Sequence, residues 1–259
     1  MKCFEEEKPI KWSFCINKVN SSKSTDLIYY FHGRNGAANW WNDKTYYTGK
    51  IHELWLKKGI EPPIVASISF GKLWLLVERE DEEHGGLYRV FLDYVMKRVE
   101  QEINNPIHHR SAMGESMGGV NTLMMAMKTK NVFNKAASLC AALPTVSPYA
   151  SLKEIYDYVN RSSTSLKRAL MMFWFSKKFY PTEEIWENND PLQLSKKNTS
   201  AGSPSIYISC GEKDEWGCME GSKLFVKNIG RTGGEIHWFS RPGGHCDIDT
   251  ESLSNFLVE

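Results

Sequence analysis

The sequence predicts an α/β fold with a mainly parallel central sheet and helices on both of its faces. Strand-like apolar runs alternate along the chain with helical stretches, a pattern typical of strand–helix–strand units. In a chain of 259 residues, 41% hydrophobic residues supply enough apolar surface for a sizeable core. We expect six main strands, at Leu27–Phe31, Ile64–Phe70, His109–Met113, Ala136–Cys140, Ser205–Cys210 and Glu235–Phe239.

Helices and an edge hairpin complete this pattern. Leu87–Ile103 carries apolar residues at the three- and four-residue spacing of an amphipathic helix, and Val120–Lys130 has the same periodicity. The opening stretch, through Trp12–Val19, is predicted to be an antiparallel hairpin at one edge of the sheet.

The segment 148–204 departs from the alternation. It consists of helical and polar stretches around a dense apolar cluster, Leu170–Phe175, and it is longer than a crossover between neighbouring strands requires. The cluster indicates either a part of the core or a small cap that lines a substrate pocket. Because the chain has no repeat, low-complexity tract or linker, we expect residues 1–259 to form one domain with a helical insertion at 148–204.

The stretch Gly114–Gly119, with the sequence GESMGG, has the residue order of a nucleophile elbow, a sharp turn between a strand and a helix that exposes one serine. Ser116 would occupy the apex of this turn in a strained conformation, where neighbouring side chains would collide. Glycine at positions 114 and 118 removes those collisions. The sequence therefore predicts that Ser116 is a nucleophile. A buried serine in a glycine-rich turn is the alternative.

A nucleophilic serine needs a histidine as base, and in this architecture the base follows the serine and the acid in the chain. Only His237 and His245 lie beyond Ser116. His237 falls inside the predicted last strand, whereas His245 follows that strand in a loop with the sequence RPGGH. Because α/β sheets place their chemistry in loops at the carboxyl ends of strands, we predict that His245 is the base.

The base needs an acid that fixes its tautomer and stabilises the imidazolium. Three aspartates lie between the serine and the histidine, namely Asp157, Asp190 and Asp214. Asp214 alone comes just after a well-defined strand, so it is the predicted acid. Asp157 falls in a predicted helix and Asp190 precedes a proline, as expected of a solvated group and of a turn or helix cap. Glu212 and Glu215 remain as substitutes.

Backbone N–H groups are expected to bind the oxyanion of the tetrahedral intermediate. Met117, the residue after the serine, offers one N–H at a helix N-terminus, and the glycine-rich turn Phe31–Gly36 offers another, which we assign to Arg34. Tryptophans close in sequence to these loops are candidates for the walls of a substrate pocket, with burial in the core as the alternative. They are Trp40, Trp41 and Trp216.

Composition limits the partners that the sequence favours. Lys and Arg number 32 against 31 Asp and Glu, so the formal charge of +1 gives no reason to expect nucleic acid or a membrane surface. No apolar segment is long enough to span a bilayer, and the first residues do not resemble a signal peptide, so we expect a cytoplasmic protein. Small or neutral ligands are more natural partners.

The six cysteines show neither the spacing of a C-x-x-C pair nor that of a zinc site, so free thiols are expected. One disulfide, between Cys218 and Cys246, is a candidate because these residues flank the predicted acid and base loops. The cysteines are Cys3, Cys15, Cys140, Cys210, Cys218 and Cys246.

These motifs together resemble the serine esterases of the α/β-hydrolase superfamily, and within it the putative-esterase group that includes esterase D, feruloyl esterases and the mycolyltransferases. The resemblance spans nearly the whole chain, and the elbow with its Met-Gly-Gly continuation is its most specific part. It rests on Phe31–Gly36, Gly114–Gly119, Gly211–Asp214 and Gly243–His245.

The resemblance implies the α/β-hydrolase fold and hydrolysis of a small-molecule carboxylic ester through an acyl-enzyme on Ser116, without a metal or organic cofactor. The group also acts on thioesters and acylated sugars and transfers acyl groups to acceptors other than water, so the substrate stays open. An acyltransferase or serine peptidase with the same triad is the second hypothesis. A protein of this fold that binds a ligand without catalysis is the third.

Overall fold

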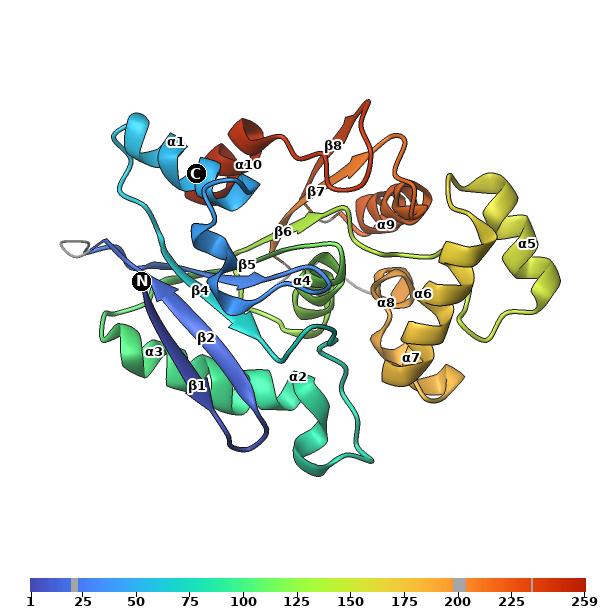
Figure 1. Ribbon diagram of the computed structural model, residues 1–259, viewed down its shortest axis with the longest axis horizontal. Helices are drawn as coiled ribbons and strands as arrows, with labels where there is room; N and C mark the ends of the chain where they lie inside the picture. Colours follow the sequence, from blue (N-terminus) through green and yellow to red (C-terminus); the bar gives the residue numbers. More distant parts are fainter. Residues whose placement is uncertain (20–22, 198–203, 234) are drawn as a thin grey trace.

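An eight-stranded sheet forms the centre of the computed structural model, which describes residues 1–19, 23–197, 204–233 and 235–259 (Figure 1). The strands lie in the order β1-β2-β4-β3-β5-β6-β7-β8. β2 pairs with β1 and with β4 in antiparallel fashion, and the remaining neighbours are parallel. The strands are β1 (Lys2–Glu6), β2 (Trp12–Asn17), β3 (Asp26–Phe31), β4 (Ile64–Ser69), β5 (His109–Glu115), β6 (Lys135–Leu139), β7 (Ser205–Gly211) and β8 (Ile236–Arg241).

The predicted fold class is confirmed, because all six predicted strands are present and the parallel part of the sheet has helices on both faces. The predicted hairpin at the start of the chain is also present, since β1 and β2 form an antiparallel edge. β5 extends past the predicted Met113 to Glu115, because its last residues still pair with neighbours on both sides: Gly114 with Phe31 of β3, and Glu115 with Leu139 of β6.

Helices occupy both sides of the sheet and a separate layer at one end of the molecule (Figure 1). The predicted helix Leu87–Ile103 is present as three successive segments, the middle one a π-helical turn. The helical segments are η1 (Ala38–Asn42), α1 (Tyr47–Lys57), η2 (Glu83–Gly85), α2 (Gly86–Val90), η3 (Phe91–Val95), α3 (Met96–Ile103), α4 (Met117–Lys128), α5 (Leu152–Arg161), α6 (Leu166–Phe179), α7 (Glu183–Asn189), α8 (Pro191–Lys197), α9 (Cys218–Arg231) and α10 (Thr250–Val258).

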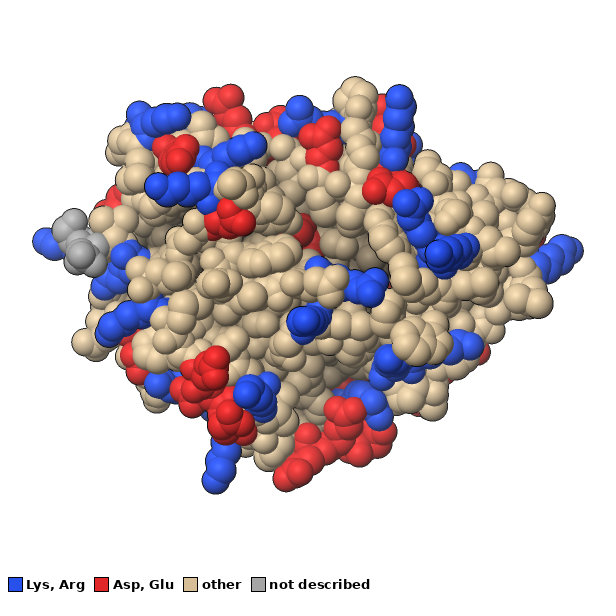
Figure 2. All heavy atoms as spheres, viewed as in Figure 1, with Lys and Arg blue, Asp and Glu red and all other residues tan. Residues whose placement is uncertain are grey.

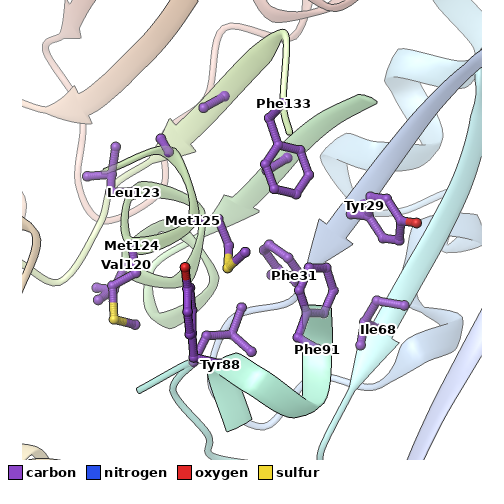
Figure 3. Close-up of a cluster of buried hydrophobic side chains, with 14 of the residues drawn as sticks. Tyr29, Phe31, Ile68, Tyr88, Phe91, Val120, Leu123, Met124, Met125 and Phe133 are labelled. Atoms are coloured by element: carbon purple, nitrogen blue, oxygen red, sulfur yellow. The ribbon is translucent and has the colours of Figure 1, made fainter. Parts of the chain in front are cut away.

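Successive residues of a strand point to opposite faces, and β3 shows how this divides the core in two. Leu27, Tyr29 and Phe31 pack with α3, α4 and α9 on one face. Figure 3 shows part of this cluster, in which side chains of β3 and β4 meet those of α4 and of the segment 86–95. Ile28 and Tyr30 point the other way, into the cluster covered by α1 and α10.

The described part of the segment between β6 and β7 contains four helices, α5 to α8. These helices form the far end of the molecule from the β1–β2 edge, with α5 outermost (Figure 1). Residues 198–203, at the end of the predicted insertion, lie outside the described part of the chain. Within the described ranges, no helix combines the length and the apolar character needed to cross a membrane.

Two disulfides are present, so the expectation of free thiols was wrong for four cysteines. Cys3 and Cys15 are joined where they stand directly opposite each other on β1 and β2. Cys140, the residue after β6, is joined to Cys246. Disulfides are commoner in proteins of oxidising compartments, so the cysteines do not support the expected cytoplasmic location.

The candidate disulfide between Cys218 and Cys246 is also wrong. Cys246 has a positive φ of 58°, and its sulfur is bonded to that of Cys140 at the carboxyl end of β6. Cys218 and Cys210 are buried and free. Sequence proximity to the acid loop suggested Cys218, but the folding of the sheet brings the end of β6 to the histidine loop instead.

A thiol titration should distinguish the two free cysteines from the four in disulfides. We expect almost no reaction in the native protein, because burial raises the pKa of both Cys210 and Cys218 and keeps reagents away. Denaturation without a reductant should expose two thiols, and reduction should expose all six. Six thiols in the denatured, unreduced protein would show that neither disulfide forms.

Candidate active site

Ser116 stands at a tight turn between β5 and α4, as the sequence predicts. Its φ of 53° lies in the left-handed region, which costs free energy for a residue with a side chain. A Cβ atom at Gly114 would lie 2.5 Å from the carbonyl oxygen of Phe31, and one at Gly118 would lie 1.9 Å from that same oxygen. Glycine at these two positions is therefore what lets the turn pack against the end of β3.

The structure brings Ser116, His245 and Asp214 together from the ends of β5, β8 and β7. Ser116 Oγ lies 3.0 Å from His245 Nε2, and His245 Nδ1 lies 2.8 Å from Asp214 Oδ2. The Asp214 side chain is completely buried, whereas that of His245 is 19% exposed. A proton can therefore pass between Ser116, His245 and a bound molecule while Asp214 stays shielded from water.

Asp214 is held as a carboxylate by its neighbours. Burial raises the pKa of Asp214, but the hydrogen bond from His245 and the backbone N–H of Trp216, 2.9 Å from Oδ1, outweigh that effect. The pKa of Asp214 consequently lies below its ordinary value. The ionised carboxylate of Asp214 accepts a hydrogen bond from His245 Nδ1 and so keeps the proton on that nitrogen.

The other candidates have different surroundings. His237 lies on β8, where it contacts Glu235 and the ring of Phe256. Asp157 is exposed on α5, and Asp190 accepts hydrogen bonds from the first backbone N–H groups of α8 and so caps that helix. The two aspartates are therefore a solvated group and a helix cap, and His237 lies within a strand, as the sequence predicts.

The two substitute acids also lie outside the hydrogen-bond chain, but one of them positions the histidine loop. Glu215 Oε2 accepts the backbone N–H of His245 at 3.0 Å. Glu212 is exposed and accepts a hydrogen bond from Ser240. Glu215 therefore fixes the backbone of the loop that carries His245.

Glu115, between the elbow glycine and the serine, is a residue that the sequence analysis overlooked. Its carboxylate is buried and accepts the backbone N–H of Gly33 at 2.6 Å. The hydroxyl groups of Tyr30 and Tyr47 donate to it at 3.1 and 2.6 Å. Burial raises the pKa of Glu115 to about 7, even though these hydrogen bonds act in the opposite direction. A charged residue inside the glycine-rich motif, next to Ser116, was the available signal.

His32 contacts the carbonyl group of Gly33, the residue whose N–H group donates to Glu115. Its Nδ1 lies 2.7 Å from the carbonyl oxygen of Gly33, and Nε2 faces the Ser69 hydroxyl at 2.8 Å and the Trp74 indole N–H at 3.3 Å. Burial lowers the pKa of His32, so the ring is neutral and Nδ1 carries its proton. Because C=O and N–H point in opposite directions across a peptide, this contact aims the N–H of Arg34 away from His32.

The N–H groups of Arg34 and Met117 are both available for a ligand. Among the described residues, neither N–H donates to a backbone or side-chain acceptor. The Arg34 side chain extends to the insertion, where its guanidinium lies 4.5 Å from the centre of the Phe175 ring.

A cavity of about 470 Å³ opens at Ser116 and His245, and its lining is mostly apolar. Of the three candidate tryptophans, Trp40 and Trp216 line this cavity. Trp41 does not, because it is buried against Tyr30 and Trp55 in the core. The remaining apolar walls come from the loop after β4, from α4 and from the insertion, and they include Leu73, Leu75, Val120, Pro148, Met172, Phe175, Phe179, Tyr180 and Trp186.

Among the described residues, two groups of potential metal ligands lie beside the cavity, Cys140 with His245 and Cys246, and Asp214 with Cys218 and His245. The sulfurs of Cys140 and Cys246 are bonded to each other, and Asp214 and His245 share a hydrogen bond. The atoms of these four residues are thus engaged within the protein, and the Sγ of the free Cys218 lies 3.9 Å from His245 Nδ1.

Glu115→Gln removes the titrating carboxyl group but keeps a side-chain oxygen that can accept hydrogen bonds, so it isolates the effect of the charge on stability. The folded protein keeps a proton on Glu115 up to a pH of about 7, where the unfolded chain has already lost it. Wild-type stability relative to the Gln variant should therefore fall as the pH rises from about 4.5 to about 7, by up to roughly 3 kcal/mol. Urea unfolding of both proteins at several pH values measures this.

Glu115→Ala is the matched variant, because it removes the acceptor of the Gly33 N–H altogether. We expect it to lower kcat strongly at pH 6, whereas Glu115→Gln should retain most of the activity. Equal losses in the two variants would show that the oxygen at this position does not hold the Gly33 loop.

Solved structures with low sequence identity have the same fold. One, described as a ferulic acid esterase, is 12% identical with a TM-score of 0.69 over 99% of this chain and 94% of its own. S-formylglutathione hydrolases from Staphylococcus aureus and Agrobacterium tumefaciens are 16% and 15% identical, with TM-scores of 0.62 and 0.63. They match 100% and 98% of this chain, and 98% and 90% of their own. At these identities the similarity concerns the fold alone.

No curated protein matches the sequence. The family model described as putative esterase matches residues 8–225, a range that includes the elbow and Asp214 but ends before His245. This match covers most of the chain and agrees with the fold of the solved structures. The chain therefore belongs to the putative esterase family and is a serine esterase with the α/β-hydrolase fold.

Proposed function

We propose that the chain hydrolyses carboxylic esters through an acyl-enzyme formed on Ser116. The observation that carries this proposal is the hydrogen-bond chain from Ser116 Oγ through His245 to Asp214, with distances of 3.0 and 2.8 Å. A serine hydroxyl is a weak nucleophile until an adjacent base takes its proton. An imidazole between the hydroxyl and a buried carboxylate supplies that base.

Each proton in the reaction passes through His245. Ser116 Oγ bonds to the carbonyl carbon while its proton moves to Nε2, and Asp214 stabilises the resulting imidazolium. The imidazolium then protonates the departing alkoxide as the bond between carbon and the leaving oxygen breaks. In the second half, His245 takes a proton from the water that attacks the acyl carbon, and it returns this proton to Ser116 as the acid leaves.

The N–H groups of Arg34 and Met117 are the proposed donors to the oxyanion. Two features support this role: both N–H groups are free among the described residues, and His32 fixes the direction of the first. Glu115 fixes the position of the same loop through Gly33. Each donor in such a site contributes about 2.7–4 kcal/mol to the stability of the transition state.

The cavity divides into two sides about Ser116. The leaving alcohol must lie near His245 to receive its proton, so it belongs beside Trp216, whose ring centre is 6.2 Å from that of His245. The acyl group then extends away from the histidine, along Val120 and under α6. A cavity of about 470 Å³ with apolar walls suits an acyl group larger than acetyl.

Ser116→Ala should lower the hydrolysis of an aryl ester by roughly 10⁴-fold or more, because no other group can form the acyl-enzyme. The fold should be unchanged, which circular dichroism and thermal unfolding will check. A fluorophosphonate should label the wild-type protein once and should not label the variant.

Ser176→Ala is the control, because Ser176 lines the same cavity on α6 without contacting His245. It should be labelled as the wild type is. Labelling of Ser116→Ala at another residue would contradict the assignment, and an unlabelled wild type would favour a binding protein without catalysis. Product analysis with added alcohols and amines will separate hydrolysis from acyl transfer.

The acyl side of the cavity should govern substrate preference. For p-nitrophenyl esters, kcat/KM should rise from acetyl to longer acyl groups, by up to about fourfold per buried methylene. Val120→Phe should narrow the cavity and lower the ratio of longer-chain to acetyl activity, with the acetyl ester as the internal reference. A wild-type protein with a higher kcat/KM for the acetyl ester than for longer acyl esters would contradict this orientation of the substrate.

A further inference from the structure

Exposed large apolar side chains are concentrated on α5 and α6. Nine such side chains occur in the described part of the chain, and five of them lie on these two helices. Their exposed fractions range from 43% to 78%. They are Leu152, Tyr156, Leu166, Leu170 and Trp174.

These five side chains, which we call the cap surface, follow helical spacing. Leu166, Leu170 and Trp174 recur every four residues and so form one stripe along α6. Leu152 and Tyr156 have the same spacing on α5. The two helices pack on each other through other residues, so in the described part of the chain both stripes stay exposed, apart from the contacts of Trp174 with Phe175 and Lys178.

The ends of the two helices are tied together beside this surface. The Tyr149 hydroxyl, just before α5, donates to the carbonyl of Tyr180, just after α6. Lys177 on α6 lies 4.9 Å from the centre of the Tyr149 ring. The start of α5 is therefore adjacent to the end of α6, and the pair forms the far end of the molecule (Figure 1).

The helices that carry the cap surface are also rich in cations, although Arg161 pairs with Glu220 and Arg168 lies over the Trp216 ring. Helix α6 carries four Lys or Arg residues and no acid, and residues 150–180 hold six cations against two acids, although the whole chain has a net charge of only +1. This end of the molecule is mostly tan and blue in Figure 2. Lys178 Nζ lies 3.9 Å from the centre of the Trp174 ring, so cation and apolar surface are contiguous.

We propose that the cap surface docks on an anionic lipid bilayer, with α6 lying in the interface. Leucine, tryptophan and tyrosine side chains insert at the level of the headgroups, and neighbouring lysines bind the phosphates. A second copy of the chain fits less well, because cations would face cations across the contact. The charge of the whole chain, which gave no reason to expect a membrane surface, conceals this local excess.

The opposite side of α6 lines the active-site cavity with Met172, Phe175 and Phe179. One helix thus separates the proposed lipid surface from the place where the acyl group would lie. This second step rests on the proposed function: esters that partition into the bilayer would be the substrates that docking favours. The docking itself does not depend on catalysis.

The test is flotation of the protein with vesicles of phosphatidylcholine alone or mixed with phosphatidylglycerol. We expect binding to the anionic vesicles that weakens with salt, and at least tenfold weaker binding to the neutral ones. The triple variant Lys167→Gln, Lys177→Gln, Lys178→Gln should lose roughly 100-fold in affinity, on the basis of about 1 kcal/mol per cation near such a surface.

The double variant Leu170→Ser, Trp174→Ser should bind at least tenfold more weakly and should hydrolyse a soluble aryl ester as the wild type does. Leu56→Ser with Tyr94→Ser is the matched control, because these exposed apolar residues lie elsewhere, and its binding should be unchanged. Ser116→Ala should bind vesicles like the wild type, which separates docking from catalysis.

Three results would overturn the proposal. They are an absence of binding to anionic vesicles, equal binding to neutral vesicles, and a self-association by sedimentation that Leu170→Ser, Trp174→Ser abolishes. The last of these would make the cap surface a contact between copies of the chain.

Discussion

The rest of the site depends on how closely the first turn of α4 approaches the carboxyl end of β3. A side chain at Gly118 would lie 1.9 Å from the carbonyl oxygen of Phe31, so only glycine permits this contact. The approach places Ser116 beside the loop after β3 and brings the carboxylate of Glu115 within 2.6 Å of the Gly33 N–H. Ser116 and the loop after β3 are thereby held to one another, and burying an acid is the cost of that rigidity.

Much of the fold and the place of the three central side chains could be predicted from the sequence. Buried parallel strands are largely apolar runs, which is why β3, β4 and β7 were found close to their true limits. The order of serine, acid and histidine then left few candidates, and the structure places Ser116, Asp214 and His245 within hydrogen-bond distance. Both inferences use features that are local in the sequence or fixed by chain order.

The features that could not be predicted from the sequence depend on residues that are distant in the chain and become neighbours only in the fold. Cys140 and Cys246 are 106 residues apart, and only the adjacency of strand ends brings them together. Trp40 and Trp41 are consecutive, yet the tight turn of η1 sends one to the cavity and the other to the core. The roles of Glu115 and of the cap surface likewise depend on what packs beside them, which periodicity does not report.

The helical insertion leaves the sheet after β6 and returns at β7, whereas the serine and histidine loops follow β5 and β8. Those two loops, and the acid loop after β7, are fixed by contacts with the sheet and with each other, including the bond between Cys140 and Cys246. Substitutions on the cavity side of α6 can therefore change the shape of the cavity while Ser116, Asp214 and His245 keep their spacing. The walls of the cavity and the hydrogen-bonded side chains beside it can thus vary separately.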